Sequence, residues 1–288
     1  MNTQNIYLPS KPHFILLDGL RGIASIIVLL YHLLEAYYLG SINQPLKHGY
    51  MAVDFFYVLS GFVISYSYDD RWEKMTFKDF IKRRLIRLHP MVIFSTFLGT
   101  LLFYFQSSET FNLINETSLL KLLLVMLWCF TLIPLPTKFD IRGWKETNPL
   151  NSPIWTLQWE YFGNIFYALI IRRLNIFFLC ILTFFSSILI ILITFNIDLL
   201  HIFNDRSDYL KYTILGGWCL LKGHIQIGLS RLLYSLSIGI LISRKKMLIK
   251  LKYGFFFLSF SLFYYYLCLG LEMIKFYGLM DCMKLLLY

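Results

Sequence analysis

Residues 15–39 read "ILLDGLRGIASIIVLLYHLLEAYYL", an apolar stretch interrupted by four ionisable side chains, Asp18, Arg21, His32 and Glu35. At 1.5 Å of rise per residue, about 20 helical residues cross the roughly 30 Å hydrocarbon core of a bilayer. The stretch is therefore long enough and apolar enough for a membrane span. It lacks the pattern of a cleavable signal peptide, so we expect it to remain as the first transmembrane helix.

The whole chain has the composition of an integral membrane protein. Of its 288 residues, 57% are hydrophobic and 15% are charged, whereas a soluble domain carries about 25% charged residues. Cytoplasmic loops of membrane proteins collect Lys and Arg, which accounts for the net charge of +10 without a nucleic-acid partner. The five cysteines are scattered and form no CxxC pair. This pattern indicates neither a disulfide framework nor a metal site.

Hydropathy predicts an all-α fold, a polytopic transmembrane bundle of about seven to nine membrane helices. We expect residues 1–288 to form one integral-membrane domain. The predicted spans are residues 15–39, 50–66, 91–106, 154–171, 176–196, 225–243 and 253–271. A further apolar stretch at 119–136 either crosses the membrane or forms a re-entrant or interfacial segment. The two prolines that follow each other closely at its end favour the second arrangement.

The distribution of basic residues predicts the orientation. Residues 68–90 contain seven Lys and Arg side chains, more than any other loop. The positive-inside rule places this loop in the cytoplasm, and the N-terminus with it because two spans precede the loop. With a re-entrant 119–136, the basic residues at 172–173 and 244–252 also fall inside. A full crossing would put both groups outside.

Arg21 and His32 share one face of the first predicted helix. Eleven steps of about 100° return His32 to within about 20° of Arg21, about 16 Å further along the axis. Asp18 and Glu35 each lie three residues from one of them, close enough to pair. Arg21 could simply extend to the interface, and His32 could be a packed polar side chain. Ionisable residues inside a membrane are costly, however, and mark function by default.

Two further groups of polar residues stand at the ends of predicted spans. Asp54 begins the second span, where a helix N-terminus favours a carboxylate, and Ser60 begins a pair of small residues that lets another helix approach closely. The arginines of the basic loop either flank the membrane or hold phosphates with their forked donors. Trp155 suits an interfacial anchor. Glu160 is a carboxylate just inside the fourth span. An ionisable side chain there costs free energy, which favours a functional role for it.

Four stretches occur in a fixed order: LDGLRGIASIIVLLYH, GYMAVDFFYVLSGFVIS, KRRLIRLHP and SPIWTLQWEYFGNIFY. Together they resemble the acyltransferase 3 family of integral-membrane acyltransferases. The resemblance implies an O-acyltransferase, by expectation an O-acetyltransferase, that moves an acyl group from cytoplasmic acyl-CoA to a hydroxyl of a cell-surface or lipid-linked carbohydrate. It also implies a multi-pass protein of the bacterial cytoplasmic (inner) membrane, in contact with membrane lipids. Acyl-CoA would be a co-substrate, with neither a tightly bound cofactor nor a metal.

The resemblance, together with the spacing of Asp18 and Glu35 from their partners, assigns roles residue by residue. Catalysis falls to His32, Asp54 and Glu35, with His32 as either the general base or the carrier of the acyl group. Donor binding falls to Arg21, Arg83, Arg84 and Arg87. A structural or substrate-site role falls to Asp18, Ser60, Trp155 and Glu160.

The chain departs from the family's usual pattern after residue 171. Its C-terminal helices are shorter than usual, and "YSLSIGI" at 234–240 only partly matches a run found near the end of the family. Two other classes of protein therefore stay open. One is a transporter or flippase whose intramembrane charges line a path, although the inverted repeats typical of transporters are not found. The other is an inactive truncated subunit. The sequence is also compatible with a homo-oligomer or with a partner subunit.

Overall fold

The computed structural model describes residues 11, 14–38, 40, 41, 44–197, 210 and 212–246. This part of the chain is helical, with no strand beyond a single antiparallel bridge between Glu146 and Cys219. It confirms the all-α class, and five of its helices are long and apolar enough to cross a membrane. The span predicted at 253–271 lies outside the described residues, so the count of seven to nine membrane helices stays a prediction.

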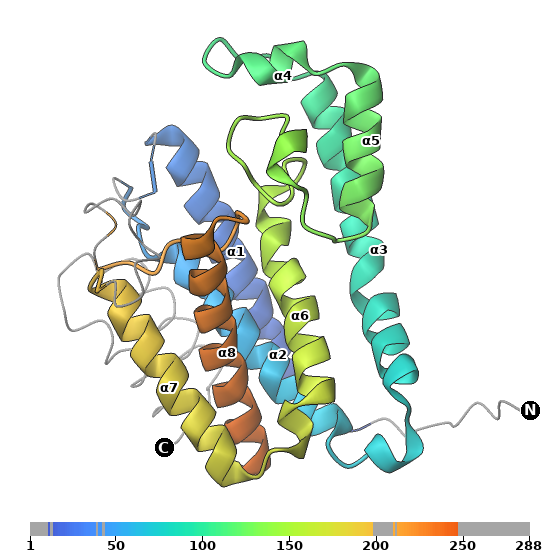
Figure 1. Ribbon diagram of the computed structural model, residues 1–288, viewed down its shortest axis with the longest axis vertical. Coiled ribbons are helices and arrows are strands. Elements are labelled where there is room, and N and C mark those ends of the chain that lie inside the picture. The colour runs from blue at the N-terminus through green and yellow to red at the C-terminus, as the bar shows by residue number, and fades with distance from the viewer. Residues whose placement is uncertain are drawn as a thin grey trace, which may run out of the picture. The chain divides into compact units, whose positions relative to one another are not determined.

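The five membrane-length helices are α1 (Ile15–Tyr37), α2 (Ala52–Tyr68, preceded by the turn Gly49–Met51), α3 (Phe77–Tyr104), α7 (Ile176–Thr194) and α8 (Lys222–Arg244), as Figure 1 shows. The shorter helices are α4 (Asn112–Glu116), α5 (Leu119–Phe130) and α6 (Trp155–Leu169). Single 3₁₀ turns lie at Trp72–Lys74, Thr137–Phe139, Ser152–Ile154 and Ile171–Arg173. The chain divides into two compact units, residues 1–74 with 235–288, and residues 75–234.

In the first unit, α2 and the last part of α8 touch through their backbones. A Cβ atom on Gly61 would overlap the carbonyl oxygen of Leu236, and one on Gly239 would overlap the carbonyl oxygen of Val58. Ser60, next to Gly61, is buried. The two glycines thus allow the close approach that small residues provide between membrane helices. The pair at 60–61 was expected to admit another helix, and the structure identifies that helix as α8.

Gly61→Ala is expected to destabilise the protein by about 1–3 kcal/mol, because the added methyl group meets backbone that no rotamer change can move aside. Gly22→Ala on α1 is the matched control, since a Cβ there has no atom within 4 Å. Alanine exceeds glycine in helix propensity by up to about 1 kcal/mol, so the control should hold or raise stability. The thermal midpoint of both purified variants in detergent measures the difference. Equal midpoints would show that the α2–α8 contact is looser than described.

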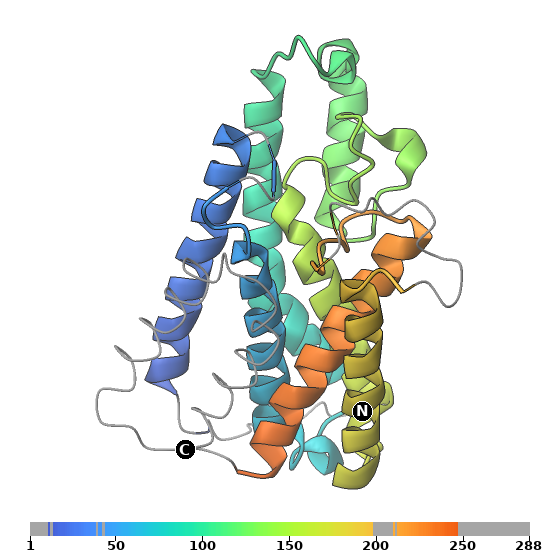
Figure 2. The same ribbon diagram turned by 90° about the vertical axis from the view of Figure 1, so that its left-hand side faces the viewer.

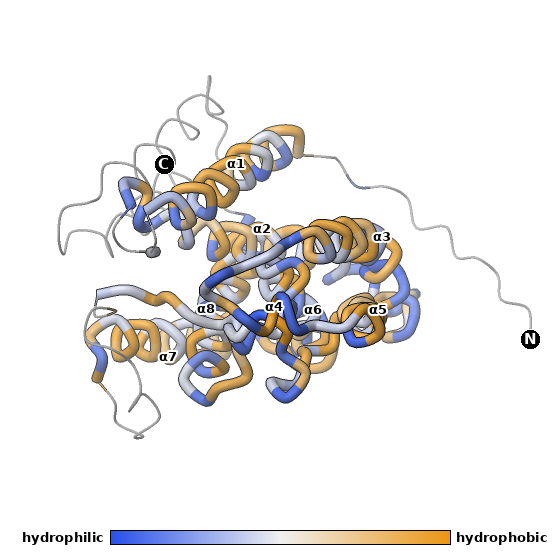
Figure 3. Tube along the Cα trace, turned by 90° about the horizontal axis from the view of Figure 1, so that it is seen from above, coloured by the Kyte–Doolittle hydropathy of each residue, from blue (hydrophilic) through white to orange (hydrophobic). Residues whose placement is uncertain are grey.

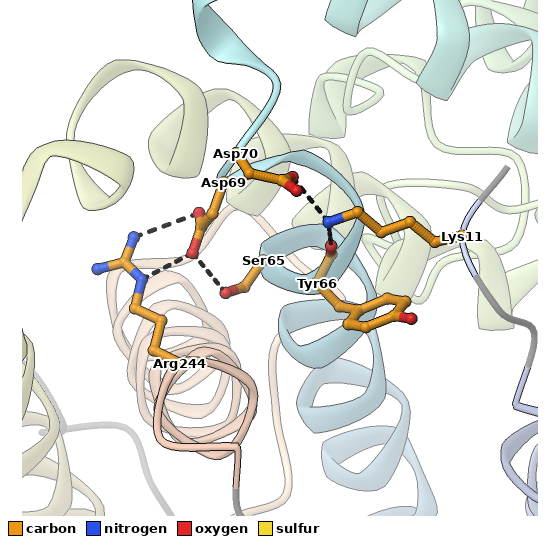
Figure 4. Close-up of polar contacts among 6 residues, drawn as sticks. All are labelled: Lys11, Ser65, Tyr66, Asp69, Asp70 and Arg244. Carbon is orange, nitrogen blue, oxygen red and sulfur yellow. Dashed lines mark hydrogen bonds and ion pairs between the residues drawn. The ribbon is translucent and has the colours of Figure 1, made fainter. Parts of the chain in front are cut away.

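A network of polar side chains lies at the C-terminal end of α2 (Figure 4). The Nζ of Lys11 donates to the carbonyl oxygen of Tyr66 at 2.5 Å and pairs with Asp70 at 2.7 Å. Arg244, at the end of α8, donates from Nε to the Asp69 carboxylate at 2.8 Å. Burial disfavours the charge of Asp70, but the hydrogen bond and charge of Lys11 outweigh it and hold the pKa of Asp70 below its usual value. The network fastens Lys11 and the end of α8 to the end of α2.

The second unit begins with a helix that starts earlier than the sequence predicted. The third span was expected at 91–106, after a loop, but α3 begins at Phe77 and continues through Pro90. Thr76 and Asp79 form a capping box, in which each side chain accepts from the other's backbone N–H at 3.2 and 3.1 Å. The basic residues from Lys78 onward therefore stand on a helix. Hydropathy missed this part because Lys and Arg are polar, yet they are good helix formers.

The stretch at 119–136 contains a helix that is too short to cross. The 12 residues of α5 rise about 18 Å, against roughly 30 Å of hydrocarbon. The chain then turns back to the end where α5 began (Figures 1 and 2). Lys121, near the start of α5, donates from Nζ to the carbonyl oxygen of Asp140 at 3.0 Å. Ile141 and Leu150 share a core with Phe103 at the end of α3.

The outward faces of several helices suit a lipid environment. Hydrophobic residues run along most of α5 and α7 (Figure 3). On α7, four large aromatic side chains are exposed, namely Phe177, Phe178, Phe184 and Phe185. Without water to satisfy them, exposed backbone groups would be costly in a bilayer, and helices avoid this by bonding internally. The described helices are thus those of a membrane protein, as predicted.

Candidate functional site

The imidazole of His32 is held by a carboxylate on the same helix. Its Nδ1 lies 2.9 Å from Oε2 of Glu35, the contact that their spacing predicted. The other carboxylate oxygen of Glu35 accepts from the Ser41 hydroxyl at 2.5 Å. The His32 side chain is 40% exposed. When Nδ1–H of His32 donates to Glu35, Nε2 is the unprotonated ring nitrogen and is able to accept a proton.

Arg21 lies on the same unbroken helix, α1. Its guanidinium donates to the Asp18 carboxylate at 2.8 Å, and both side chains are partly exposed. Since α1 has no break between them, Arg21 and His32 stay on one face, about 16 Å apart along the axis. The two ion pairs predicted on the first span are therefore both present.

The start of α2 lies beside the part of α1 that carries His32. The rings of Tyr31 and Tyr50 are 6.2 Å apart, and Gly49 packs against the Tyr31 side chain. Asp54, one turn further along α2, is buried with 3% of its surface exposed. Its place in the first turn is one where the helix dipole stabilises a carboxylate. The residues expected to act in catalysis therefore gather toward one end of the first unit.

In the second unit, the arginines expected to bind the donor divide into two kinds. Arg84 is buried on α3 and donates from Nη2 to the Glu160 carboxylate on α6 at 2.8 Å, with only 3% and 17% of the two side chains exposed. Arg83 and Arg87 are exposed on the same helix. The structure thus pairs two residues that the sequence assigned to different roles. Of the four arginines expected to bind the donor, Arg83 and Arg87 on α3 and Arg21 on α1 have guanidinium groups that could reach phosphates.

Trp155 forms part of a cluster that includes a residue the sequence analysis missed. It is 7% exposed at the start of α6, and its ring lies 5.6 Å from the guanidinium of Arg231 on α8. Arg231 is 1% exposed and donates toward the carbonyl oxygens of Ile214 and Gly216 at 3.5 and 3.4 Å. The signal was present, because an arginine inside the span predicted at 225–243 is as costly as His32.

The described residues contain no group of three or more His, Cys, Asp and Glu side chains placed to hold a metal ion. Three ion pairs lie among the residues that the sequence singled out: the His32–Glu35 pair, the Arg21–Asp18 pair and the Arg84–Glu160 pair.

Comparison with known proteins gives one family and several relatives. A family model described as an acyltransferase domain matches residues 14–284. The chain is 29% identical over 164 residues to "Protein 2 in picA locus" of Rhizobium radiobacter, which covers 54% of this chain and 81% of that protein. No solved structure matches.

Two further relatives are named as O-acetyltransferases. The chain is 40% identical over 91 residues to the O-acetyltransferase OatA of Staphylococcus aureus (strain NCTC 8325 / PS 47), which is 31% of this chain and 13% of that protein. It is 38% identical over 89 residues to the peptidoglycan O-acetyltransferase OatA of Listeria monocytogenes serovar 1/2a, 30% of this chain and 12% of that protein. The matched regions are thus a small part of both enzymes. Because the family model spans nearly the whole chain, this protein belongs to the acyltransferase 3 family, as its ordered motifs predicted.

Proposed function

We propose that this protein is a membrane-embedded O-acetyltransferase, which moves an acetyl group from cytoplasmic acyl-CoA to a hydroxyl of a cell-surface or lipid-linked carbohydrate. The observation that carries the proposal is the His32–Glu35 pair, at 2.9 Å on the first helix of an acyltransferase domain. The acetyl group and the carbohydrate acceptor are supported by relatives named for O-acetyl transfer, one of them to peptidoglycan.

His32 supplies the base that the reaction needs. Its Nε2 takes the proton of the acceptor hydroxyl while the oxygen attacks the thioester carbonyl carbon. The carbon–sulfur bond then breaks, and the thiol of coenzyme A leaves with the proton that His32 returns. Glu35 stabilises the imidazolium formed between these steps. Ser41 holds Glu35 in place by donating to its second oxygen.

Acyl-CoA enters from the cytoplasmic face of the membrane, where the predicted orientation places the donor-binding arginines. Arg83 and Arg87 are exposed and present forked donors that suit the phosphates of coenzyme A. Arg21 lies on the cytoplasmic side of α1 in the predicted orientation. The pantetheine arm then follows the rise of about 16 Å from Arg21 to His32, so donor and acceptor approach the reaction from opposite faces.

The return of α5 supports this orientation. Since α5 leaves the membrane at the end where it entered, the basic residues at 172–173 and 244–246 fall on the same side as 68–90, in agreement with the positive-inside rule. The two ends of α3 then lie on opposite faces of the membrane. Lys78 in its first turn and Glu109 beyond its last turn are both exposed.

In a background without native cysteines, Lys78→Cys is expected to react only with thiol reagents that reach the cytoplasm, and Glu109→Cys only with reagents added outside. The two positions flank one helix, so each serves as the control for the other. Labelling of whole cells before and after permeabilisation measures the sidedness. The reverse pattern would overturn the orientation and the two-sided mechanism with it.

The proposed function is tested by mass analysis of cell-envelope glycans with and without the gene. Loss of acetyl groups from one glycan in the deletion strain, restored by the wild-type gene, is the expected result. Identical acetylation in both strains would contradict the proposal. Transfer from labelled acetyl-CoA to the same glycan by the protein in proteoliposomes then confirms that the activity belongs to this chain.

A further inference from the structure

Two segments about 70 residues apart meet in the second unit. The backbone N–H of Thr147 donates to the carbonyl oxygen of Trp218 at 2.8 Å, and the carbonyl oxygen of Thr147 accepts from Leu135 at 3.0 Å. Arg142, in the same segment, donates to Gln106 just beyond the end of α3 at 3.1 Å. The meeting point therefore lies at the end of α3 opposite to Lys78, the end that faces outward in the proposed orientation.

Buried polar groups at this point have no partner. Thr147 and Asn148 are 5% and 1% exposed, yet the hydroxyl of Thr147 and Nδ2 of Asn148 form no hydrogen bond. Oδ1 of Asn148 is occupied, because it accepts from the backbone of Asn151 at 3.1 Å. An unsatisfied buried polar group costs about 1–3 kcal/mol, and native proteins contain few. Thr147 and Asn148 thus present two neighbouring groups that the described residues do not pair, and a bound hydroxyl or a water molecule can satisfy them.

Three aromatic rings lie together at Trp218, whose backbone makes the contact with Thr147. Trp218, whose carbonyl binds Thr147, has its ring 6.4 Å from that of Trp155 and 4.7 Å from that of His224. The guanidinium of Arg231 lies over the Trp155 ring, 5.6 Å from its centroid. Gly217 has a φ of 113°, and a Cβ there would strike the Trp155 ring, so only glycine fits this turn. The rings are thus fixed in position before any ligand arrives.

We infer that Thr147, Asn148 and Trp218 bind the carbohydrate acceptor, with Trp155 holding the Trp218 ring in place. Binding sites for small molecules combine aromatic walls with a few placed polar groups. A sugar ring presents C–H faces that pack on indole and hydroxyls that pair with an amide and a hydroxyl. These groups are neutral, so they suit a neutral polyol rather than the phosphates of the donor. The inference rests on the proposed function and names the place where its acceptor is recognised.

Thr147→Val and Asn148→Leu keep the size of each side chain and remove the unpaired polar group. The dissociation constant for alkali-deacetylated cell-envelope glycan, with its lipid-linked fraction included, is measured on the full-length protein in detergent. We expect it to rise about tenfold in the double variant, since two neutral hydrogen bonds contribute about 0.5–1.5 kcal/mol each. Affinity for acetyl-CoA should not change.

Asn115→Leu is the matched control. Its carboxamide has both ends paired with the backbone of Ser108, at 3.1 and 2.7 Å, so its loss should leave glycan affinity unchanged. Thr147→Val alone removes a hydroxyl that has no partner, so it should fold normally even if Asn148→Leu does not. A wild-type protein that does not bind the glycan, or a folded Thr147→Val variant with wild-type affinity, would overturn the inference. Weakened binding together with absent acetyl transfer in the wild type would keep the site and refute the proposed function.

Discussion

His32→Ala is expected to lower acetyl transfer by about 10²–10⁴-fold, the range typical for the loss of a positioned general base. Its imidazole, 2.9 Å from Glu35, is the proposed base on α1. The side chain is 40% exposed, so its removal opens no core cavity and the protein should still fold. Initial rates with labelled acetyl-CoA in proteoliposomes, at equal protein and with the thermal midpoint checked, measure the loss.

Leu33→Ala is the control for this change, because Leu33 is the next residue on α1 and is 58% exposed. It should keep the wild-type rate. Near-normal turnover in His32→Ala would remove His32 from the mechanism. The wild-type protein separates the two roles that remain for His32. An acyl carrier gives an acetylated His32 peptide after mixing with acetyl-CoA alone, whereas a general base gives none.

The parts of the fold that sequence predicted are those fixed by local pattern. The apolar runs of α1, α2, α7 and α8 are long enough that hydrophobicity alone decides them. The start of α3 was missed because its first turns are basic, and the capping box at Thr76 sets the boundary instead. The prolines after α5 favoured its return without deciding it, because the apolar stretch at 119–136 was long enough for a crossing and the structure ends the helix at Phe130.

The same division applies to the site. The His32–Glu35 and Arg21–Asp18 contacts join residues three apart on one helix, and the helical repeat predicts such pairs. The pair of Arg84 and Glu160 joins residues 76 apart, and no local pattern indicates which carboxylate an arginine will meet. The cluster around Trp218 also depends on loops that pack only in the folded chain. Long-range pairing is set by how helices pack, which periodicity does not specify.

Arg84→Leu is expected to destabilise the protein by about 3–5 kcal/mol, because it removes the ion pair that Arg84 makes with the half-buried Glu160 carboxylate. Arg84 is 3% exposed and Glu160 is 17% exposed, so water does little to replace the lost ion pair. The double variant Arg84→Leu/Glu160→Leu should recover much of the loss, since an apolar pair of similar size often replaces a buried ion pair at little cost. The thermal midpoint in detergent measures all three proteins.

Arg83→Gln/Arg87→Gln is the matched comparison, because both arginines are exposed on the same helix, α3. It should leave the thermal midpoint unchanged and weaken the binding of coenzyme A, whose phosphates lose two forked donors. The two sets of variants therefore separate a residue that joins α3 to α6 from residues that meet the donor. If Arg84→Leu kept its thermal midpoint but lost affinity for coenzyme A, Arg84 would bind the donor directly, and its pairing with Glu160 would be the resting arrangement of a donor site.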